Sequence, residues 1–207
     1  MPPLQRWQGE QRRIGLTGGI ASGKSSVGRV LEQHHHLPLL DADVFAREAL
    51  AAGSAGTQAV LQRYGTAVQE QSGVINRRAL GAIVFNNPSE REWLEQLVHP
   101  LVRQRFDAEL EHLAEAPVVV LVIPLLFESG LEVICSETWL VDCDEAQQLE
   151  RLMQRDQLSE QEATARIQAQ WPLTRKRQLA DQLISNRGTQ NELAAAVQRS
   201  LQAGLTP

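Results

Sequence analysis

The stretch IGLTGGIASGKS, from Ile14 to Ser25, decides which fold class this chain belongs to. Its second part, Gly18 to Ser25, matches the phosphate-loop pattern G-x-x-x-x-G-K-[ST] at every fixed position. A short apolar strand is predicted at residues 14–17 before the loop, and a helical pattern follows it. Glycines let such a loop turn several N–H groups toward one phosphate, and the positive end of the following helix adds to the attraction. The stretch therefore predicts a site for a nucleoside triphosphate.

Individual residues of the loop predict distinct contacts with that ligand. The Lys24 ammonium is expected to reach the β- and γ-phosphates as a catalytic group, and the Ser25 hydroxyl to bind Mg²⁺. ATP is thus the expected co-substrate and Mg²⁺ the expected cofactor. The loop residues that we expect to bind ATP are Gly19, Ile20, Ala21, Ser22, Gly23, Lys24, Ser25 and Ser26.

Further short apolar segments predict the rest of a sheet. Strands alternate with helices along the chain, which predicts a three-layer α/β fold of the P-loop type with a doubly wound parallel sheet. Beyond residues 14–17, the expected strands are 37–40, 118–123, 138–141 and 183–184, and the expected later helices are 145–170 and 190–203.

The segment 45–114 has an amphipathic helical pattern and no segment suited to the sheet. We therefore interpret it as a helical insertion, broken at Gly53–Gly56, around Gly65–Gly73 and at Asn86–Pro88. The expected domains are a flexible tail at 1–12, a nucleotide-binding core at 13–44 and 115–207, and the insertion at 45–114.

Composition excludes several other classes of protein. The chain has 207 residues, a formal charge of −5 and a pI of about 5.6, which argues against nucleic acid as its main partner. Residues 1–13 lack the apolar stretch of a secretory signal, and the longest apolar run, 118–127, is far below the roughly 20 residues of a membrane helix. We expect a soluble, cytoplasmic protein that binds no membrane. The oligomeric state is not predicted.

Metal-binding and disulfide patterns are also weak. The two cysteines, Cys135 and Cys143, indicate neither a disulfide framework nor a zinc site. The triple histidine His34–His36 is interpreted as a solvated helix end rather than a metal site.

Other motifs separate the classes of protein that share a phosphate loop. A GTPase switch needs Asn-Lys-x-Asp and Asp-x-x-Gly, and neither tetrapeptide occurs in the sequence. A motor or transporter ATPase needs an apolar strand that ends in an acidic pair. The best rival for that role is the strand ending at Asp142, but no Leu-Ser-Gly-Gly-Gln sequence follows it. A small-molecule kinase needs neither motif, so this class is favoured.

Two groups of charged residues suit phosphoryl transfer. Asp41 and Asp43 follow the carboxyl end of a predicted strand, where ligands bind in open α/β sheets, and Arg47 lies one helical turn beyond Asp43. A carboxylate there can accept the proton of an attacking hydroxyl, or it can simply cap a helix. Arg151 and Arg155 lie one turn apart on a polar helix, where they can offset phosphate charge or form a salt-bridged solvent face.

Several blocks in a fixed order carry a resemblance to a known family. The phosphate loop is followed by Asp41-Ala42-Asp43-x-x-x-Arg47, His99-Pro100, Pro124-Leu125-Leu126-Phe127-Glu128, Arg151-x-x-x-Arg155-Asp156 and Ala180-Asp181-x-x-Ile184-x-Asn186-x-Gly188. Over residues 14–188 the chain thereby resembles the dephospho-CoA kinases. The phosphate loop is shared widely, whereas the Asp-Ala-Asp, Pro-Leu-Leu-Phe-Glu and Ala-Asp blocks together are far more specific.

The resemblance implies a substrate, dephospho-CoA, whose ribose 3′-hydroxyl receives the ATP γ-phosphate in the last step of coenzyme A biosynthesis. It also implies that the insertion binds CoA and that residues 145–172 form a small mobile lid within the core. Alternatives that remain open are a related nucleotide or sugar kinase and a P-loop ATPase that regulates a partner.

The same resemblance implies roles for single residues. Asp43 would be the base, Arg155 a catalytic lid residue, and Asn186 and Gly188 would contact the adenine of ATP. The implied substrate-binding residues are Asp41, Arg47, His99, Glu128 and Arg151. From its own sequence context, His99 is a helix-end or packing residue. The chain also departs from the family at Ala21, where glycine is usual, and an alanine fits there if φ is negative.

Overall fold

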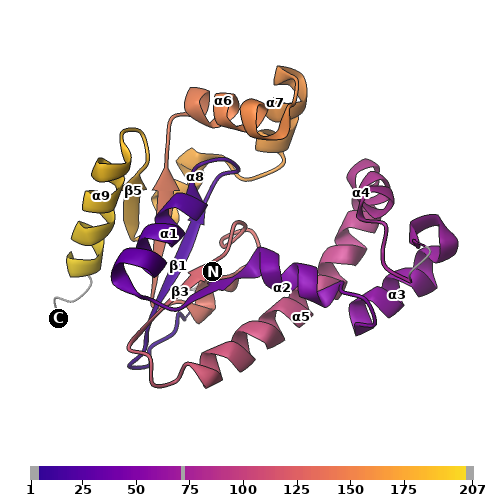
Figure 1. Ribbon diagram of the computed structural model, residues 1–207, viewed down its shortest axis with the longest axis horizontal. Coiled ribbons are helices and arrows are strands. Elements are labelled where there is room, and N and C mark those ends of the chain that lie inside the picture. Colours follow the sequence, from indigo (N-terminus) through magenta and orange to yellow (C-terminus); the bar gives the residue numbers. More distant parts are fainter. Residues whose placement is uncertain (1–4, 71–72, 204–207) are drawn as a thin grey trace. The chain divides into compact units, whose positions relative to one another are not determined.

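The computed structural model describes residues 5–70 and 73–203 and divides the chain into two compact units (Figure 1). The sheet unit extends to Leu40 and resumes at Leu113, and the helical unit comprises Asp41–His112. We expected the insertion to begin at residue 45. The helical unit begins earlier because helix α2 starts at Ala42, directly after strand β2.

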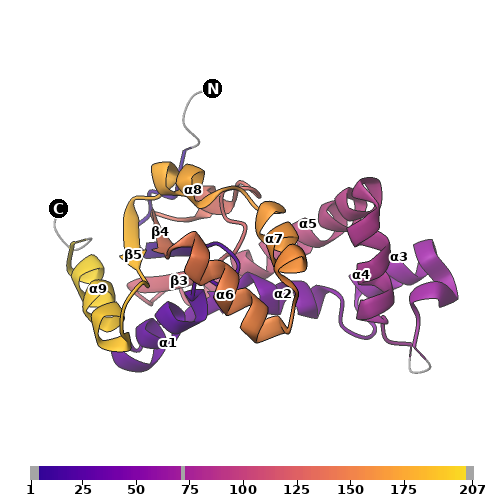
Figure 2. The ribbon, with the colours of Figure 1, turned by 90° about the horizontal axis from the view of Figure 1, so that it is seen from above.

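The sheet unit is built on a five-stranded sheet with the strand order β2-β3-β1-β4-β5 (Figures 1 and 2). Strand β1 pairs in parallel with both β3 and β4, and β4 pairs in parallel with β5. The strands are β1 (Arg12–Gly18), β2 (Leu39–Asp41), β3 (Val118–Val122), β4 (Glu137–Asp142) and β5 (Gln182–Ser185). Each of the five strands predicted from the sequence is thereby confirmed.

Alternating side chains of the strands pack on the two faces of the sheet. On one face, Ile14 and Leu16 of β1 lie in a buried cluster with α1 (Lys24–His35) and α9 (Gln190–Ala203). On the other face, Leu140 of β4 packs against α8 (Leu173–Leu179). Figure 2 shows the strands between α8 and the pair α1 and α9, so the expected doubly wound arrangement is confirmed.

The N-terminal segment is partly folded. Arg12 is the first residue of β1, and its side chain pairs with Glu137 at 2.5 Å. The amide of buried Gln11 donates to the backbone oxygens of Leu113 (2.7 Å) and Ala116 (3.0 Å). The prediction of a flexible tail up to residue 12 is therefore wrong for residues 11 and 12, and residues 1–4 lie outside the described part of the chain.

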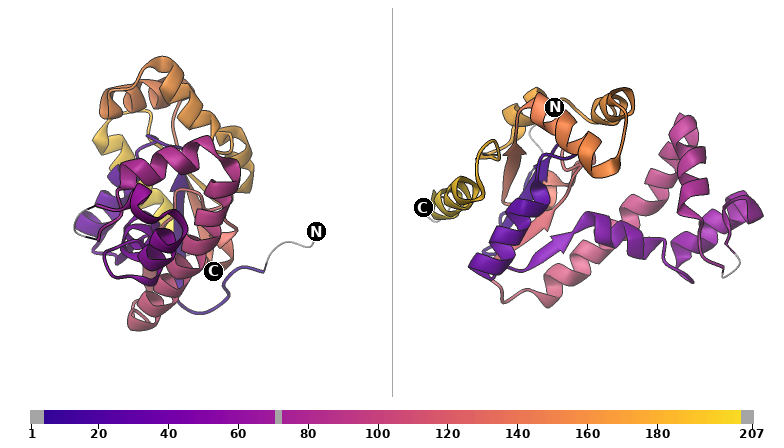
Figure 3. Two further views of the ribbon diagram at one scale, coloured as in Figure 1. Left: turned by 90° about the vertical axis from the view of Figure 1, so that its right-hand side faces the viewer. Right: turned by 45° about the horizontal axis from the view of Figure 1, so that its top comes forward.

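Residues 145–170 are helical as expected, and they form two separate helices. Helix α6 (Glu145–Asp156) ends where Gln157 adopts a positive φ of 55°, a conformation that cannot continue a right-handed helix. Helix α7 (Glu160–Gln168) then begins with a capping box between Ser159 and Glu162. The two helices pack against each other and are visible together in Figure 3.

Two other short features of the sheet unit agree with the sequence. The helix α1 ends at the histidine triplet, because His36 has a φ of 53°, which confirms the predicted helix end. The 3₁₀ helix η2 (Leu131–Ile134) leads toward β4 and is followed by Cys135, which is fully buried. Desolvation raises the pKa of the Cys135 thiol to about 12. Cys135 and Cys143 are both buried free thiols.

The helical unit has its own hydrophobic cluster around Val60, Val68, Ile75 and Leu80. Polar side chains cap its helices, since Ser54 accepts from the N–H of Thr57 and Asn76 from that of Ala79. Its elements are α2 (Ala42–Ala49), α3 (Ala55–Tyr64), η1 (Gly65–Val68), α4 (Arg77–Asn86) and α5 (Pro88–His112). The breaks between them lie where the glycines and the Asn-Asn-Pro sequence predicted them. Across the described residues, no helix is long and apolar enough to cross a membrane.

An ion pair with aromatic neighbours joins α3 to α5 in this unit. Glu90 accepts two hydrogen bonds from Arg63 (2.8 and 3.0 Å) and one from the Tyr64 hydroxyl (2.5 Å). The Arg63 guanidinium also lies 4.5 Å from the centre of the Trp93 ring. The hydrogen bonds from Arg63 and then Tyr64 lower the pKa of Glu90 from 4.5 to about 2.

We predict that Glu90→Gln destabilises the protein in a pH-dependent manner. Because the folded-state pKa of Glu90 lies below its ordinary value of 4.5, its contribution is present above about pH 4.5 and is lost as the pH falls toward 2. The difference in Tm between wild type and variant should be largest at pH 7 and should shrink below pH 4.5, as measured by thermal unfolding. Glu111→Gln, an exposed carboxylate on α5, is the control. A pH-independent difference would contradict the prediction.

Candidate active site

The phosphate loop joins the end of β1 to the start of α1. Gly23, the N-cap of α1, has a φ of 97°, and a Cβ atom there would collide with the side-chain amide of Asn186. Gly18 lies similarly close to the Ser22 hydroxyl, 2.5 Å from where its Cβ would be. Backbone conformation and close packing thus both favour glycine at position 23, whereas at position 18 close packing alone does so.

The polar side chains of the loop differ in their contacts and in their exposure. Lys24 donates to the backbone oxygens of Gly18 (2.9 Å) and Gly19 (3.0 Å), so its ammonium folds back over the loop. Ser25 lies exposed in the first turn of α1, and the N–H of Ser26 donates to Gly23. The Ser22 hydroxyl is buried and has no hydrogen-bond partner among the described residues.

Side-chain amides from other segments hold the loop in place, a feature that the sequence did not reveal. Gln148 of α6 donates to the backbone oxygen of Ile20 (2.8 Å), and Gln170, after α7, accepts from the N–H of Ile20 (2.8 Å). Asn186, after β5, donates to the backbone oxygen of Ser22 (2.8 Å). Of these three residues, the sequence analysis had singled out Asn186 alone, as an expected contact of ATP.

Ala21 adopts a left-handed conformation with a φ of 57°. The condition of a negative φ, under which we expected an alanine to fit at this position, is therefore not met. The Cβ of an L-residue is crowded in this region of φ/ψ space, at a cost of about 1–2 kcal/mol. The loop keeps the curvature typical of glycine and carries the strain of a methyl group.

Asn186 connects three parts of the sheet unit. Besides its bond to Ser22, its N–H donates to the Asp142 backbone oxygen (2.8 Å), and its own backbone oxygen accepts from Arg151 Nη2 (3.1 Å). Arg151 Nη1 is buried without a hydrogen-bond partner among the described residues. Arg151 therefore contacts the segment after β5, which contains the residues expected to bind adenine. The sequence analysis had instead assigned Arg151 to binding of the acceptor substrate. Gly188 precedes α9 and lies against Glu192.

Asp142 at the end of β4 is engaged by two cations. Its carboxylate pairs with Arg177 (2.8 Å) and with Arg187 (2.8 Å), and only 10% of its side chain is exposed. A motor-type ATPase uses the carboxylate at this position around Mg²⁺. The two arginines leave little acceptor capacity for that role, which weakens the ATPase interpretation.

Arg155 lies on the exposed side of α6, with 57% of its side chain accessible. It forms two parallel hydrogen bonds to Asp156 (2.7 and 3.0 Å), and Arg166 of α7 contacts the same carboxylate (2.9 Å). The bonds from Arg155 lower the pKa of Asp156. The arginine fork is thus already shaped to bind a planar pair of anionic oxygens.

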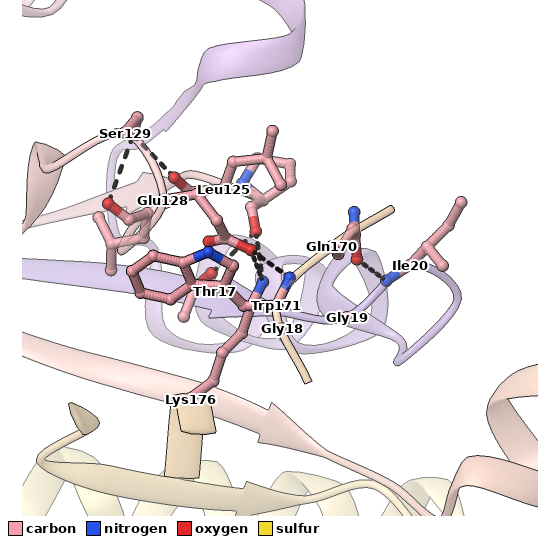
Figure 4. Close-up of polar contacts among 12 residues, drawn as sticks. Thr17, Gly18, Gly19, Ile20, Leu125, Glu128, Ser129, Gln170, Trp171 and Lys176 are labelled. Atoms are coloured by element: carbon pink, nitrogen blue, oxygen red, sulfur yellow. Dashed lines mark hydrogen bonds and ion pairs between the residues drawn. The ribbon is translucent and has the colours of Figure 1, made fainter. Parts of the chain in front are cut away.

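Glu128 lies in the turn after β3, close to the first residues of the phosphate loop (Figure 4). Its Oε1 atom lies 2.7 Å from the ammonium of Lys176 and accepts from the N–H of Trp171 (3.1 Å). Its Oε2 atom is buried and has no hydrogen-bond partner among the described residues.

The helical unit carries the remaining predicted site residues. Asp41 is the N-cap of α2, since its carboxylate accepts from the N–H groups of Asp43 (2.7 Å) and Val44 (3.4 Å). Asp43 lies in the first turn of α2, and Arg47 Nε donates to its backbone oxygen (3.0 Å). The capping alternative thus applies to Asp41. His99 is exposed in the interior of α5, so the expectation of a helix-end or packing residue is wrong.

The loop is also suited to Mg²⁺. This ion keeps several waters and usually takes one or two protein ligands together with substrate phosphates. The exposed Ser25 hydroxyl, next to Lys24 in the first turn of α1, suits such a site. Within the described ranges, no group of three or more His, Cys, Asp or Glu side chains forms a metal cage.

The fold and the loop together define a class of protein. A five-stranded sheet with flanking helices and with the phosphate loop on its central strand is the architecture of a P-loop kinase. A crystal structure of a Thermus thermophilus protein superposes with a TM-score of 0.84 at 37% identity, covering 96% of this chain and all of that one. A Campylobacter jejuni dephospho-CoA kinase shares the fold, with a TM-score of 0.64 at 24% identity over 94% of this chain and 98% of its own.

Sequence comparison is more specific. The family profile described as dephospho-CoA kinase matches residues 12–192. A dephospho-CoA kinase of Synechococcus sp. (strain CC9605) is 65% identical over 86% of either chain. One of Prochlorococcus marinus (strain MIT 9313) is 59% identical over 90% of this chain and 93% of its own. The chain belongs to the dephospho-CoA kinase family.

We predict that Ala21→Gly stabilises the protein. Relief of the strain at a φ of 57° outweighs the greater freedom of glycine in the unfolded chain, so unfolding should require about 0.5–1 kcal/mol more free energy. Denaturant unfolding measures the change. The matched control is Ala165→Gly, at an exposed position inside α7, which should lose about 1 kcal/mol. Equal losses in both variants would rule out strain at Ala21.

Proposed function

We propose that this protein transfers the γ-phosphate of ATP to the ribose 3′-hydroxyl of dephospho-CoA, the last step of coenzyme A biosynthesis. The observation that carries the proposal is a complete phosphate loop in a member of this family, together with the Asp41-Ala42-Asp43-x-x-x-Arg47 sequence on α2. The proposed location of the reaction is the cytoplasm.

The phosphate loop supplies the electrostatic part of the proposed reaction. When ATP binds, the Lys24 ammonium exchanges the carbonyls of Gly18 and Gly19 for phosphate oxygens, which are better acceptors because they carry charge. The loop N–H groups and the N-terminus of α1 then stabilise charge on the transferring group. Mg²⁺, held on the protein side by Ser25, would further neutralise the phosphate oxygens.

Asp43 is the proposed base of the reaction. Its carboxylate accepts the proton of the 3′-hydroxyl while that oxygen attacks the γ-phosphorus and ADP leaves. Asp41 fixes the first turn of α2 by capping it, and thereby orients Asp43. Arg47, one turn further along the same helix, is the proposed partner of a substrate phosphate, and His99 of α5 has a minor role on the acceptor side.

The pair of helices α6 and α7 is the proposed lid, and its closure would bring Arg155 to the phosphates. The fork of Arg155 would then exchange the Asp156 carboxylate for phosphate oxygens of similar geometry. We propose that the nucleotide is bound by Arg151, Asn186 and Gly188. Arg151 donates to the backbone oxygen of Asn186, and its buried Nη1 has no hydrogen-bond partner among the described residues, so it can donate to the nucleotide.

The decisive experiment supplies ATP and Mg²⁺ together with dephospho-CoA, AMP or adenosine, and locates the new phosphate by mass and NMR. Dephospho-CoA should react well above AMP, and adenosine should be slowest, because remote contacts to a long substrate orient its reacting hydroxyl. Only the 3′-phosphate should form. Lys24→Ala is the control, and its turnover should fall by about a hundredfold or more.

Two other outcomes would replace the proposal. Conversion of AMP to ADP at a rate equal to or above that of dephospho-CoA would identify a nucleotide kinase. ATP hydrolysis without any phosphorylated acceptor would support the ATPase interpretation.

We predict that Asp43→Asn lowers turnover about a hundredfold to ten-thousandfold, because the amide keeps the shape of the side chain and cannot accept the proton. ATP affinity, measured by calorimetry without acceptor, should stay near that of wild type. Asp107→Asn, an exposed carboxylate on α5, is the control with normal turnover. A variant that kept its rate and melted early would instead assign Asp43 to stability of α2.

A further inference from the structure

A buried ion pair lies beside the phosphate loop. The Lys176 side chain of α8 is 0% exposed, and its ammonium lies 2.7 Å from Glu128 Oε1 and 3.4 Å from the backbone oxygen of Pro124. Glu128 itself is 15% exposed. A fully buried ammonium requires an anionic partner, so these two side chains depend on each other. The pair fixes α8 to the turn after β3.

The same carboxylate oxygen also reaches the segment between α7 and α8. Glu128 Oε1 accepts the N–H of Trp171 (3.1 Å), and the adjacent Gln170 accepts the N–H of Ile20 in the phosphate loop (2.8 Å). Figure 4 shows these contacts as a continuous series, from Lys176 through Glu128 to the Gln170-Trp171 dipeptide and on to Ile20. One dipeptide is thus held on one side by the ion pair and holds the loop on the other.

A second side chain, from helix α6, also binds the backbone of Ile20. Gln148, which is 2% exposed, donates to the backbone oxygen of Ile20 (2.8 Å). Both backbone polar groups of Ile20 therefore bind side chains that lie near the two ends of the α6–α7 segment. A loop whose backbone polar groups are fixed in this way keeps its curvature before a ligand arrives, which favours ligand binding.

We propose that Glu128 is a positioning residue for ATP. With its charge balanced by Lys176, it fixes Trp171 and Gln170, and through Gln170 it sets the shape of the phosphate loop. The proposal rests on the ATP-binding part of the proposed function. It differs from the role expected for Glu128 in the sequence, which was direct contact with the acceptor substrate.

The two roles of Glu128 predict different changes in affinity. If Glu128 acts through the loop, its loss weakens the binding of ligands with phosphates in the loop and leaves the affinity for dephospho-CoA unchanged. If its buried Oε2 atom accepts a hydrogen bond from the acceptor, its loss weakens the binding of dephospho-CoA instead. A structural role alone lowers Tm and changes neither affinity.

The test measures dissociation constants by calorimetry for ATP, adenosine and dephospho-CoA, each alone. The variants are Gln170→Ala, the double variant Glu128→Met/Lys176→Met, and all three changes combined. Replacing both charges at once avoids an unpaired buried ion. Gln178→Ala, an exposed glutamine on α8, is the matched control.

We expect Gln170→Ala and the double variant each to raise the Kd for ATP about fivefold to tenfold, as the loss of one hydrogen bond implies. The combined variant should bind ATP no more weakly than the weaker of the two, because the changes act on one path. Adenosine and dephospho-CoA should bind as in wild type, and the control should match wild type throughout.

Other outcomes overturn the proposal. Additive effects of the changes on the Kd for ATP would show that Glu128 does not act through Gln170. An unchanged Kd in the double variant would show that Glu128 and Lys176 contribute only to the stability of the fold. A raised Kd for dephospho-CoA would assign Glu128 to the acceptor. If the double variant does not fold, Glu128→Gln takes its place, because the neutral amide weakens the bonds to both Lys176 and Trp171. Phosphorylation of dephospho-CoA by wild type is scored separately, so failure of this inference leaves the proposed function intact.

Discussion

A loop that turns its N–H groups toward a ligand must leave its remaining polar groups facing the protein, and these need partners. The phosphate loop satisfies this constraint with amides from distant segments. Gln148, Gln170 and Asn186 bind the backbone of Ile20 and Ser22, and Asn186 occupies the space left by the missing side chain of Gly23. Through these hydrogen bonds the loop is tied to three later parts of the sheet unit: helix α6, the segment after α7 and the segment after β5.

Helix α8 makes a related contribution through charge. Two of its cations, Lys176 and Arg177, pair with carboxylates near the ends of the two strands that flank β1. These carboxylates are Glu128, in the turn after β3, and Asp142, the last residue of β4. Each of the two carboxylates is bound by a cation of α8. The arrangement distinguishes the acidic residues that maintain the sheet unit from Asp43, which lies on α2 of the helical unit.

Much of the fold follows from sequence pattern, because the five strands are short apolar runs and the loop has a strict motif. The supports of the site do not. Lys176 lies in the run Arg175-Lys176-Arg177, where nothing local tells which cation is buried, and only tertiary packing selects it. The division between α6 and α7 at Gln157 depends on one residue with a positive φ and has neither glycine nor proline to mark it. His99 is followed by Pro100, which suggests a helix end, yet α5 continues through both.

The alanine in the phosphate loop has a consequence for nucleotide recognition. Alanine has fewer backbone conformations than glycine, so a loop that contains Ala21 at a φ of 57° has fewer alternative shapes to sample when empty. Less conformational entropy is then lost when a triphosphate binds. One methyl group therefore has two effects, since it lowers the stability of the folded protein and narrows the range of shapes open to the empty loop.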